Sequence, residues 1–222
     1  MFSICSNARS LPKQIILKLI VRVIFKLSYE MENEELFKLL AGKYPLRLEL
    51  KEKLSEMIKR EYYSKSQIIL KPGQIATRAW FIEKGAAMGV IFREEKKVPF
   101  WFWNEGELMV SLNSFFNQVP SESYIELLEP SVLLSISFEN VSEIMKTYPE
   151  SHEYIRKIMH EYQRMSEKRI LEFAAYSPEE HYLHLMKDCP AIFRKASVES
   201  IAAYLGISRK TLNRIRNRTR RM

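Results

Sequence analysis

The sequence predicts an α+β protein: an antiparallel β-roll with flanking helices, then a long helix and a C-terminal helix-turn-helix. Three observations support this prediction. Short apolar or alternating runs, separated by turn residues, fill the stretch from Glu61 to Ile136. A segment free of Gly and Pro then follows Pro149 and continues to about Tyr176, as a long helix requires. Finally, Val198–Asn217 contains two short helical patterns on either side of a glycine.

Bulk composition favours a folded protein of a reducing compartment. The chain has 222 residues, of which 46% are hydrophobic and 12% aromatic, as expected of globular cores rather than disorder. It contains two cysteines, Cys5 and Cys189, which cannot form a disulfide framework. We therefore expect a cytoplasmic protein.

Residues 1–30 are expected to form an N-terminal extension with a basic amphipathic helix. The apolar segment Pro12–Leu27 is interrupted by Lys18, Arg22 and Lys26, whose spacing of four places them on one helical stripe. Three charges in so short a stretch argue against a transmembrane span. Such a helix lies either on a membrane surface or against the protein body, and membrane contact is the less favoured of the two. A further alternative is that translation begins at Met31, so that residues 1–30 are not part of the native protein.

The β-roll is predicted to follow two helices, Glu32–Leu40 and Pro45–Lys59. A change from helical to alternating periodicity after Lys59 marks its start. Leu108–Phe116 is more helix-like and interrupts the strands, and a helix Phe138–Tyr148 ends the roll. The predicted strands are Gln67–Leu70, Ala79–Glu83, Ala87–Phe92, Val98–Trp103, Tyr124–Leu128 and Val132–Ser137.

Adjacent residues of a strand face opposite sides, which limits the role of the aromatic run Phe100–Trp103. At most half of this run can line a ligand pocket. Core packing with one exposed edge explains the run equally well.

The long helix at 149–176 carries apolar residues at a spacing of three to four, with charges at most other positions. This pattern is typical of a short coiled-coil seam and favours a dimer. Packing on the same chain is the alternative. The candidate seam residues are Ile155, Ile158, Met159, Tyr162 and Met165.

The C-terminal region begins with residues that are typical of the start of a helix. Ser177 precedes Pro178, Glu179 and Glu180, which together form a typical helix start. The helix that they open ends before Pro190 and runs almost directly into the next motif.

Ser197 can cap a helix Val198–Leu205, and Ser208 can cap a second one after Gly206. The inward-facing positions of this helix-turn-helix are Ile201, Ala202, Leu205, Ile207, Leu212 and Ile215.

The positive charge of the chain is concentrated in this region. The net charge is +8, and residues 190–222 contain nine Lys or Arg against the single acid Glu199, which accounts for the whole excess. A neutral body with a compact basic end points to a polyanion partner, and a solubilising or disordered tail is the alternative. Because the basic residues lie on a helix-turn-helix, we expect the polyanion to be double-stranded DNA. The candidate DNA-binding residues are Ser208, Arg209, Lys210, Thr211, Asn213, Arg214, Arg216 and Arg218.

The order of these parts resembles the CRP/FNR (catabolite activator) superfamily. Lys71-Pro72-Gly73 and Trp80–Gly85 look like early strands and turns of its cyclic-nucleotide-binding β-roll, and Gly106-Glu107-Leu108 looks like the opening of its phosphate cassette. The resemblance implies a sensor domain at 31–148, a dimerisation helix at 149–176 and a DNA-binding domain at 177–222. It also implies a homodimer, with RNA polymerase as a further candidate partner.

The cassette departs from the pattern of cyclic-AMP-binding members, which ends in Arg-Ser/Thr-Ala. Aligned backward from Ile136-Ser137, those positions are Ser121, Glu122 and Ser123. A carboxylate near a phosphate repels it where a guanidinium attracts it. We therefore expect no useful affinity for cyclic AMP and an unknown effector, if any. The candidate effector-pocket residues are Gly106, Glu107, Leu108, Ser121, Glu122 and Ser123.

No catalytic motif is found in the sequence, so we do not expect an enzyme. His181 and His184 lie one helical turn apart near Asp188 and Cys189, which is compatible with a metal site but is more typical of a solvated helix face. We expect neither a metal nor a cofactor. The alternative to a transcription regulator is a cyclic-nucleotide-like ligand-binding module that acts through protein–protein contacts.

Overall fold

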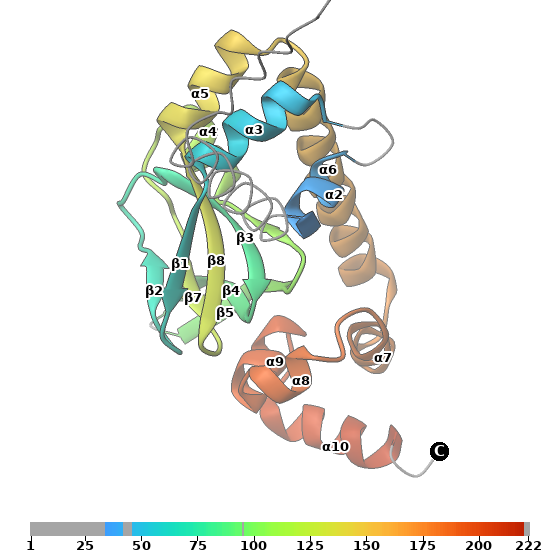
Figure 1. The fold of residues 1–222 in the computed structure, drawn as a ribbon. Helices are drawn as coiled ribbons and strands as arrows, with labels where there is room; N and C mark the ends of the chain where they lie inside the picture. Colours follow the sequence, from blue (N-terminus) through green and yellow to red (C-terminus); the bar gives the residue numbers. More distant parts are fainter. Residues whose placement is uncertain (1–33, 42–45, 95, 220–222) are drawn as a thin grey trace, which may run out of the picture.

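A computed structural model of the chain describes residues 34–41, 46–94 and 96–219 (Figure 1). The predicted extension at 1–30 lies outside these residues. Helices α2 (Glu34–Ala41) and α3 (Leu48–Met57) precede the strands, and α5 (Phe138–Thr147) follows them. The strands are β1 (Lys59–Tyr63), β2 (Ile68–Leu70), β3 (Arg78–Lys84), β4 (Ala86–Arg93), β5 (Lys96–Asn104), β6 (Leu108–Met109), β7 (Tyr124–Leu127) and β8 (Ser131–Ser137).

The strands form two antiparallel sheets of four, with orders β1-β8-β3-β6 and β2-β7-β4-β5. All six predicted strands are confirmed within a few residues, but β1 was not identified separately, and the helix expected over Leu108–Phe116 is shorter. Leu108 and Met109 pair with Phe81 and Trp80 as β6, and α4 (Leu112–Asn117) begins only afterwards. Strand pairing at a distance therefore overrides the local helical pattern.

Side chains from both sheets fill the interior of the roll. Trp80, Ile82, Trp103, Met109 and Phe115 belong to one buried cluster and are each 4% exposed or less. Burial of this much aromatic and aliphatic surface is the main source of the free energy that stabilises the roll. The space between the sheets is thus occupied by the protein's own side chains.

Strand β4 is buried on both faces, which explains its continuous apolar run from Ala86 to Val90. Ala87 faces the roll interior, whereas Met88 and Val90 pack in a cluster with Leu212 of the C-terminal helices. Gly89 permits close approach of the neighbouring strand, because a Cβ atom there would lie 2.6 Å from Phe100 Cζ.

The long helix α6 (Ser151–Ala175) runs along the side of the roll and leads to the C-terminal helices, as Figure 1 shows. These are α7 (Pro178–Asp188), α8 (Ile192–Lys195), α9 (Val198–Tyr204) and α10 (Arg209–Thr219). The single-turn helix α8 was not predicted and separates α7 from the helix-turn-helix. It places Ile192, which is fully buried, in the core of the C-terminal part. None of the helices in the described part of the chain is long and apolar enough to cross a membrane.

Candidate nucleic-acid interface

The two helices of the helix-turn-helix begin at the predicted caps. Ser197 Oγ accepts a hydrogen bond from the Ser200 N–H at 3.0 Å, and Ser208 Oγ accepts one from the Thr211 N–H at 3.1 Å. Each bond satisfies a backbone donor that the first turn of a helix leaves free. Between the helices, Gly206 adopts a φ of +68°, which favours glycine. The Ile207 N–H donates to the Ala202 carbonyl at 2.9 Å and closes the turn.

Five of the six predicted inward-facing residues of this motif are buried, and Ile207 in the turn is half-buried. Ile201, Ala202, Leu205, Leu212 and Ile215 are each 5% exposed or less. This apolar seam fixes the orientation of α10, so that its polar side chains lie on the opposite face.

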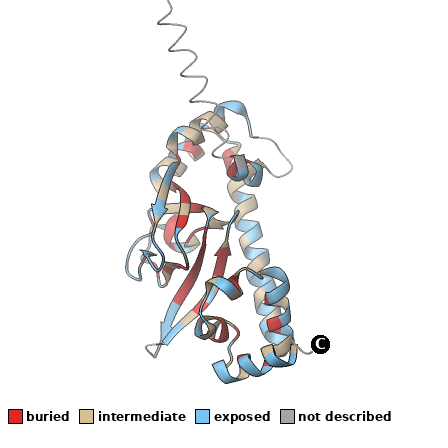
Figure 2. Ribbon diagram, turned by 60° about the horizontal axis from the view of Figure 1, so that its bottom comes forward, coloured by how far each residue is buried: buried red, intermediate tan, exposed pale blue. Residues whose placement is uncertain are grey.

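The structure places the predicted DNA-binding residues on or beside that exposed face, and Figure 2 shows most of α10 as exposed. Exposed members are Ser208, Arg209, Lys210, Asn213, Arg214 and Arg218, whereas Thr211 and Arg216 are half-buried.

Two arginines of this face are held by acidic residues of the same chain. Arg209 Nη1 lies 2.8 Å from Glu199 Oε1, and Arg218 Nη1 lies 2.7 Å from Glu179 Oε2. Lys210, Arg214 and Arg216 form no ion pair with any described residue. The positive charge without an ion-pair partner therefore extends along α10 from its first turn to Arg216, where it attracts a polyanion.

The helix-turn-helix packs directly on the roll, which sequence reasoning did not anticipate. The ring centroids of Phe102 in β5 and Tyr204 in α9 lie 4.7 Å apart. Lys195 Nζ lies 2.7 Å from Glu129 Oε1 and donates to the Gly85 carbonyl at 3.2 Å. A strand whose residues are apolar without alternation is expected to be covered on both faces, and β4 has this pattern.

The long helix also contacts this junction. The Arg169 guanidinium carbon of α6 lies 3.4 Å from the centroid of the Tyr204 ring, and Arg169 Nη2 donates to the Tyr204 carbonyl at 2.9 Å. Burial lowers the pKa of Arg169 and raises that of Tyr204 to about 12. The roll and α6 therefore both contact Tyr204 of α9.

Four of the five candidate seam residues contact their own chain. Ile155 and Ile158 line an apolar cavity of about 130 Å³ between α6 and the roll, and Met165 lines a neighbouring groove. Tyr162 donates to the Leu108 carbonyl and accepts from Trp103 Nε1 at 3.2 Å. Met159 alone of the five is exposed, at 40%. Some of the regularly spaced apolar residues of α6 therefore pack within the chain. Packing on the same chain was the alternative to a dimer seam.

A separate row of exposed residues runs along α6. It comprises Met159, Gln163, Ser166, Ile170 and Phe173, at alternating spacings of four and three residues. Ile170 is 67% exposed and Phe173 is 49% exposed, although both are apolar. Such spacing is that of positions a and d in a coiled coil.

The six candidate effector-pocket residues fall into two groups. Gly106, Glu107 and Leu108 line a groove of about 440 Å³ between β5 and α6, together with Trp101 and Trp103. Burial raises the pKa of the Glu107 carboxyl, although Glu107 Oε2 accepts the Asn104 N–H at 2.9 Å. The alternation expected of the aromatic run is confirmed, because Trp101 and Trp103 reach this groove while Phe102 faces α9.

Ser121, Glu122 and Ser123 lie elsewhere, and in the described part of the chain they do not line that groove. Ser121 is buried, and its hydroxyl donates to the Ser123 carbonyl at 3.0 Å. Glu122 is exposed to solvent. The groove lined by Gly106, Glu107 and Leu108 therefore does not include the other three candidates.

Comparison with known proteins agrees with this architecture. Residues 60–148 match the family described as the cyclic nucleotide-binding domain. No curated protein sequence matches the chain significantly.

Among solved structures, a crp/fnr-family transcriptional regulator from Eubacterium rectale matches with a TM-score of 0.63 and 19% identity, over 77% of this chain and 82% of that one. The global regulator CLP of Xanthomonas campestris, described as c-di-GMP responsive, matches with a TM-score of 0.62 and 15% identity, over 78% and 92%. The catabolite activator protein of Thermus thermophilus matches with a TM-score of 0.51 and 16% identity, over 81% and 85%.

These structural neighbours are regulators, not enzymes. The chain thus has the fold of the CRP/FNR transcription regulators, and residues 60–148 resemble their cyclic nucleotide-binding domain.

Proposed function

We propose that the protein is a cytoplasmic, sequence-specific DNA-binding transcription regulator of the CRP/FNR type, acting as a homodimer. The observation that carries this proposal is the exposed face of α10, where Lys210 and Arg214 project from a capped and fully packed helix-turn-helix without an acidic partner among the described residues. A surface of this kind fits the major groove of DNA.

The eight candidate residues divide by the chemistry that they offer. Arg209, Lys210 and Arg214 present donors for guanine edges, and Asn213 can pair with adenine. Ser208 and Thr211 hold the start of α10 and place their hydroxyls near its first turn, 2.9 Å apart. Arg216 and Arg218 lie toward the end of α10, where contacts with phosphates are expected.

Two of these arginines exchange partners when DNA binds. Arg209 leaves Glu199 and Arg218 leaves Glu179, and both pairs are exposed enough that their loss costs little.

The exposed row on α6 supports a homodimer. Met159, Gln163, Ser166, Ile170 and Phe173 form a seam that a second copy would cover, in place of the seam residues that pack within the chain. A two-fold dimer presents two copies of α10 to successive major grooves.

We further propose that the protein does not respond to cyclic AMP. Ser121 is engaged by its own loop, Glu122 adds a negative charge, and the space between the sheets is filled by Trp80, Trp103 and Phe115. A cyclic phosphate therefore finds no guanidinium at the cassette positions 121–123. The partner of the sensor domain at 31–148 is then an effector of another kind.

Fluorescence anisotropy of labelled duplex DNA across a salt series tests the proposal. The full chain should bind with a steep salt dependence, because each phosphate that it neutralises releases counterions. The double variant Lys210→Ala with Arg214→Ala should bind DNA more weakly, by about 1–3 kcal/mol for each base edge that no longer has a side-chain donor. The control is Lys65→Ala, which changes one exposed lysine of the roll and should bind as the wild type does.

Equal DNA binding by the α10 variant and the wild type would contradict the proposal. Binding of a ligand with no DNA binding under any salt condition would instead favour a sensor module that acts through protein contacts.

A further inference from the structure

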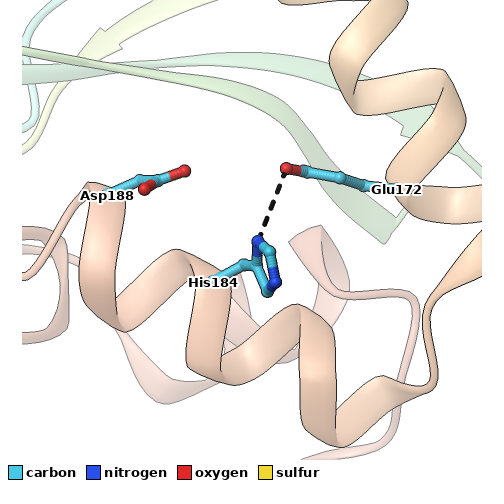
Figure 3. Close-up of side chains that lie close together, drawn as sticks. All are labelled: Glu172, His184 and Asp188. Carbon is cyan, nitrogen blue, oxygen red and sulfur yellow. Dashed lines mark ion pairs between the residues drawn. The ribbon is translucent and has the colours of Figure 1, made fainter.

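Three potential metal ligands from two helices meet at the junction of α6 and α7. Glu172 lies in the last turns of α6, and His184 and Asp188 lie one turn apart on α7; their ligand atoms are all within 4.8 Å of one another. Figure 3 shows the three side chains directed toward one another across the gap between the helices. His184 Nδ1 lies 4.0 Å from Glu172 Oε1.

The polar groups around this gap are incompletely satisfied. Glu172 Oε1 is buried and accepts no hydrogen bond from any described residue. Glu172 and Asp188 line a cleft of about 390 Å³ that is also lined by His181, which is only 7% exposed and whose Nε2 is likewise without a partner in the described part of the chain. Buried polar atoms without partners are rare in native proteins, and a bound ligand or ion is one of the reasons for them.

The ammonium group of Lys168 already lies near these carboxylates. Lys168 Nζ lies 2.7 Å from Asp188 Oδ2 and 3.7 Å from Glu172 Oε1. Positive charge is therefore favoured between the two carboxylates. Because the Lys168 side chain is about half exposed, its ammonium group can swing into solvent at little cost.

We propose that Glu172, His184 and Asp188 bind a divalent transition-metal ion such as Zn²⁺, which displaces the Lys168 ammonium. One imidazole nitrogen and two carboxylate oxygens form a donor set that suits such ions and leaves a coordination position for water. Metal–ligand bonds of about 2.0–2.2 Å require the three ligand atoms to approach one another by about 1 Å. Rotation of exposed side chains provides that movement, since His184 and Asp188 are each more than 40% exposed.

The imidazole of His184 has an aromatic neighbour. The ring of Tyr176 lies against that of His184, with centroids 4.5 Å apart. A bound ion would join the end of α6 to the first helix of the C-terminal part by coordinate bonds, in place of a solvent-exposed ion pair. The coordination site needs no DNA, so its test is independent of the DNA-binding proposal.

Calorimetric titration of the full chain, prepared without a histidine tag, with ZnCl₂ at neutral pH tests the site. We expect saturable binding of one ion per chain. Loss of a residue that only supports a metal ligand typically weakens metal binding about 10–100-fold. His184→Gln and Asp188→Asn each remove a ligand, so each should weaken Zn²⁺ binding by at least that factor. Lys168→Met should bind more tightly than the wild type, because it removes the competing cation and keeps the length of the side chain.

Two controls distinguish this site from adventitious binding. His160→Gln removes an exposed histidine of α6 and should leave the affinity unchanged. Cys189→Ser should also retain binding, because the thiol is not a ligand in this proposal. Circular dichroism without metal checks that each variant is folded.

No saturable binding by the folded wild type would overturn the proposal, whatever the variants do. So would unchanged affinity in His184→Gln, or loss of binding in Cys189→Ser.

Discussion

Phe102 and Tyr204 are separated by more than a hundred residues of sequence, yet their rings pack 4.7 Å apart and join the roll to the helix-turn-helix. Phe102 is only 7% exposed and belongs to a cluster shared by β4, β5 and the C-terminal helices. The two parts of the chain therefore share one apolar core, and the position of α10 depends on the roll.

Phe102→Ala should lower the free energy of unfolding by about 3 kcal/mol or more, because it removes a buried ring and leaves a cavity. Urea denaturation followed by circular dichroism measures the loss. Phe92→Ala is the matched control, since Phe92 is 48% exposed and its loss should cost much less. A similar cost for both variants would show that the shared core contributes little.

The Lys195–Glu129 ion pair should contribute to the same junction. Lys195 is 16% exposed, and Lys195→Met leaves both Glu129 and the Gly85 carbonyl without this donor. We expect a loss of about 1–3 kcal/mol in the free energy of unfolding. A double-mutant cycle with Glu129→Gln isolates the coupling between the two side chains.

The control for that cycle is an exposed pair on α6. Arg156→Gln breaks its bond to Glu153, where both side chains are largely in solvent, and should change stability little. A coupling energy near zero for Lys195 and Glu129 would contradict the prediction.

The capping box at the start of α7 gives a third prediction. Ser177 Oγ accepts the Glu180 N–H, and Glu180 Oε2 accepts the Ser177 N–H at 2.7 Å. Ser177→Ala should cost about 0.5–2 kcal/mol, measured by thermal or urea unfolding. Ser55→Ala should not destabilise the protein, because the Ser55 hydroxyl bonds only the Lys51 carbonyl one turn earlier in α3, where alanine is the better helix former. Destabilisation of the same size in both variants would argue against a specific cap.

Stability should depend on the protonation of Glu107. Burial raises the pKa of this carboxyl above its ordinary value of 4.5, and the hydrogen bond from the Asn104 N–H only partly opposes that shift. The folded state therefore binds the proton more tightly than the unfolded state, and stability is lost as pH rises through the interval between the two pKa values.

Glu107→Gln removes the charge and keeps an oxygen acceptor, so it should stabilise the protein at pH 7. The advantage should fade as the pH drops and disappear well below 4.5, where Glu107 is protonated in both states. Urea denaturation of both proteins at several pH values measures this difference. An advantage that is independent of pH would assign the effect to packing instead of charge.

Much of the helix-turn-helix was predictable because its signals are local. The caps Ser197 and Ser208 and the turn at Gly206 act on backbone groups within a few residues of themselves. The apolar period of α9 and α10 determines which residues face inward, and the basic residues take the other face. Strand positions in the roll follow from alternation and turn residues for the same reason.

The sequence predicted less where one face of a helix or strand packs against an element that is distant in sequence. The apolar period of α6 is consistent both with a dimer seam and with packing on the roll, and only the fold shows that Tyr162 contacts Trp103 and Leu108. Likewise, the cassette pattern named Ser121 and Glu107 as candidates for one pocket, whereas the groove that Glu107 lines does not include Ser121.

By itself, the sequence determined the order of the elements, the caps and the basic face of α10, since each depends on neighbours along the chain. Only the tertiary structure decided that Phe102 meets Tyr204, and that Glu172 joins His184 and Asp188. The physical reason is that periodicity shows which side of an element is apolar or polar, but not which other element covers that side.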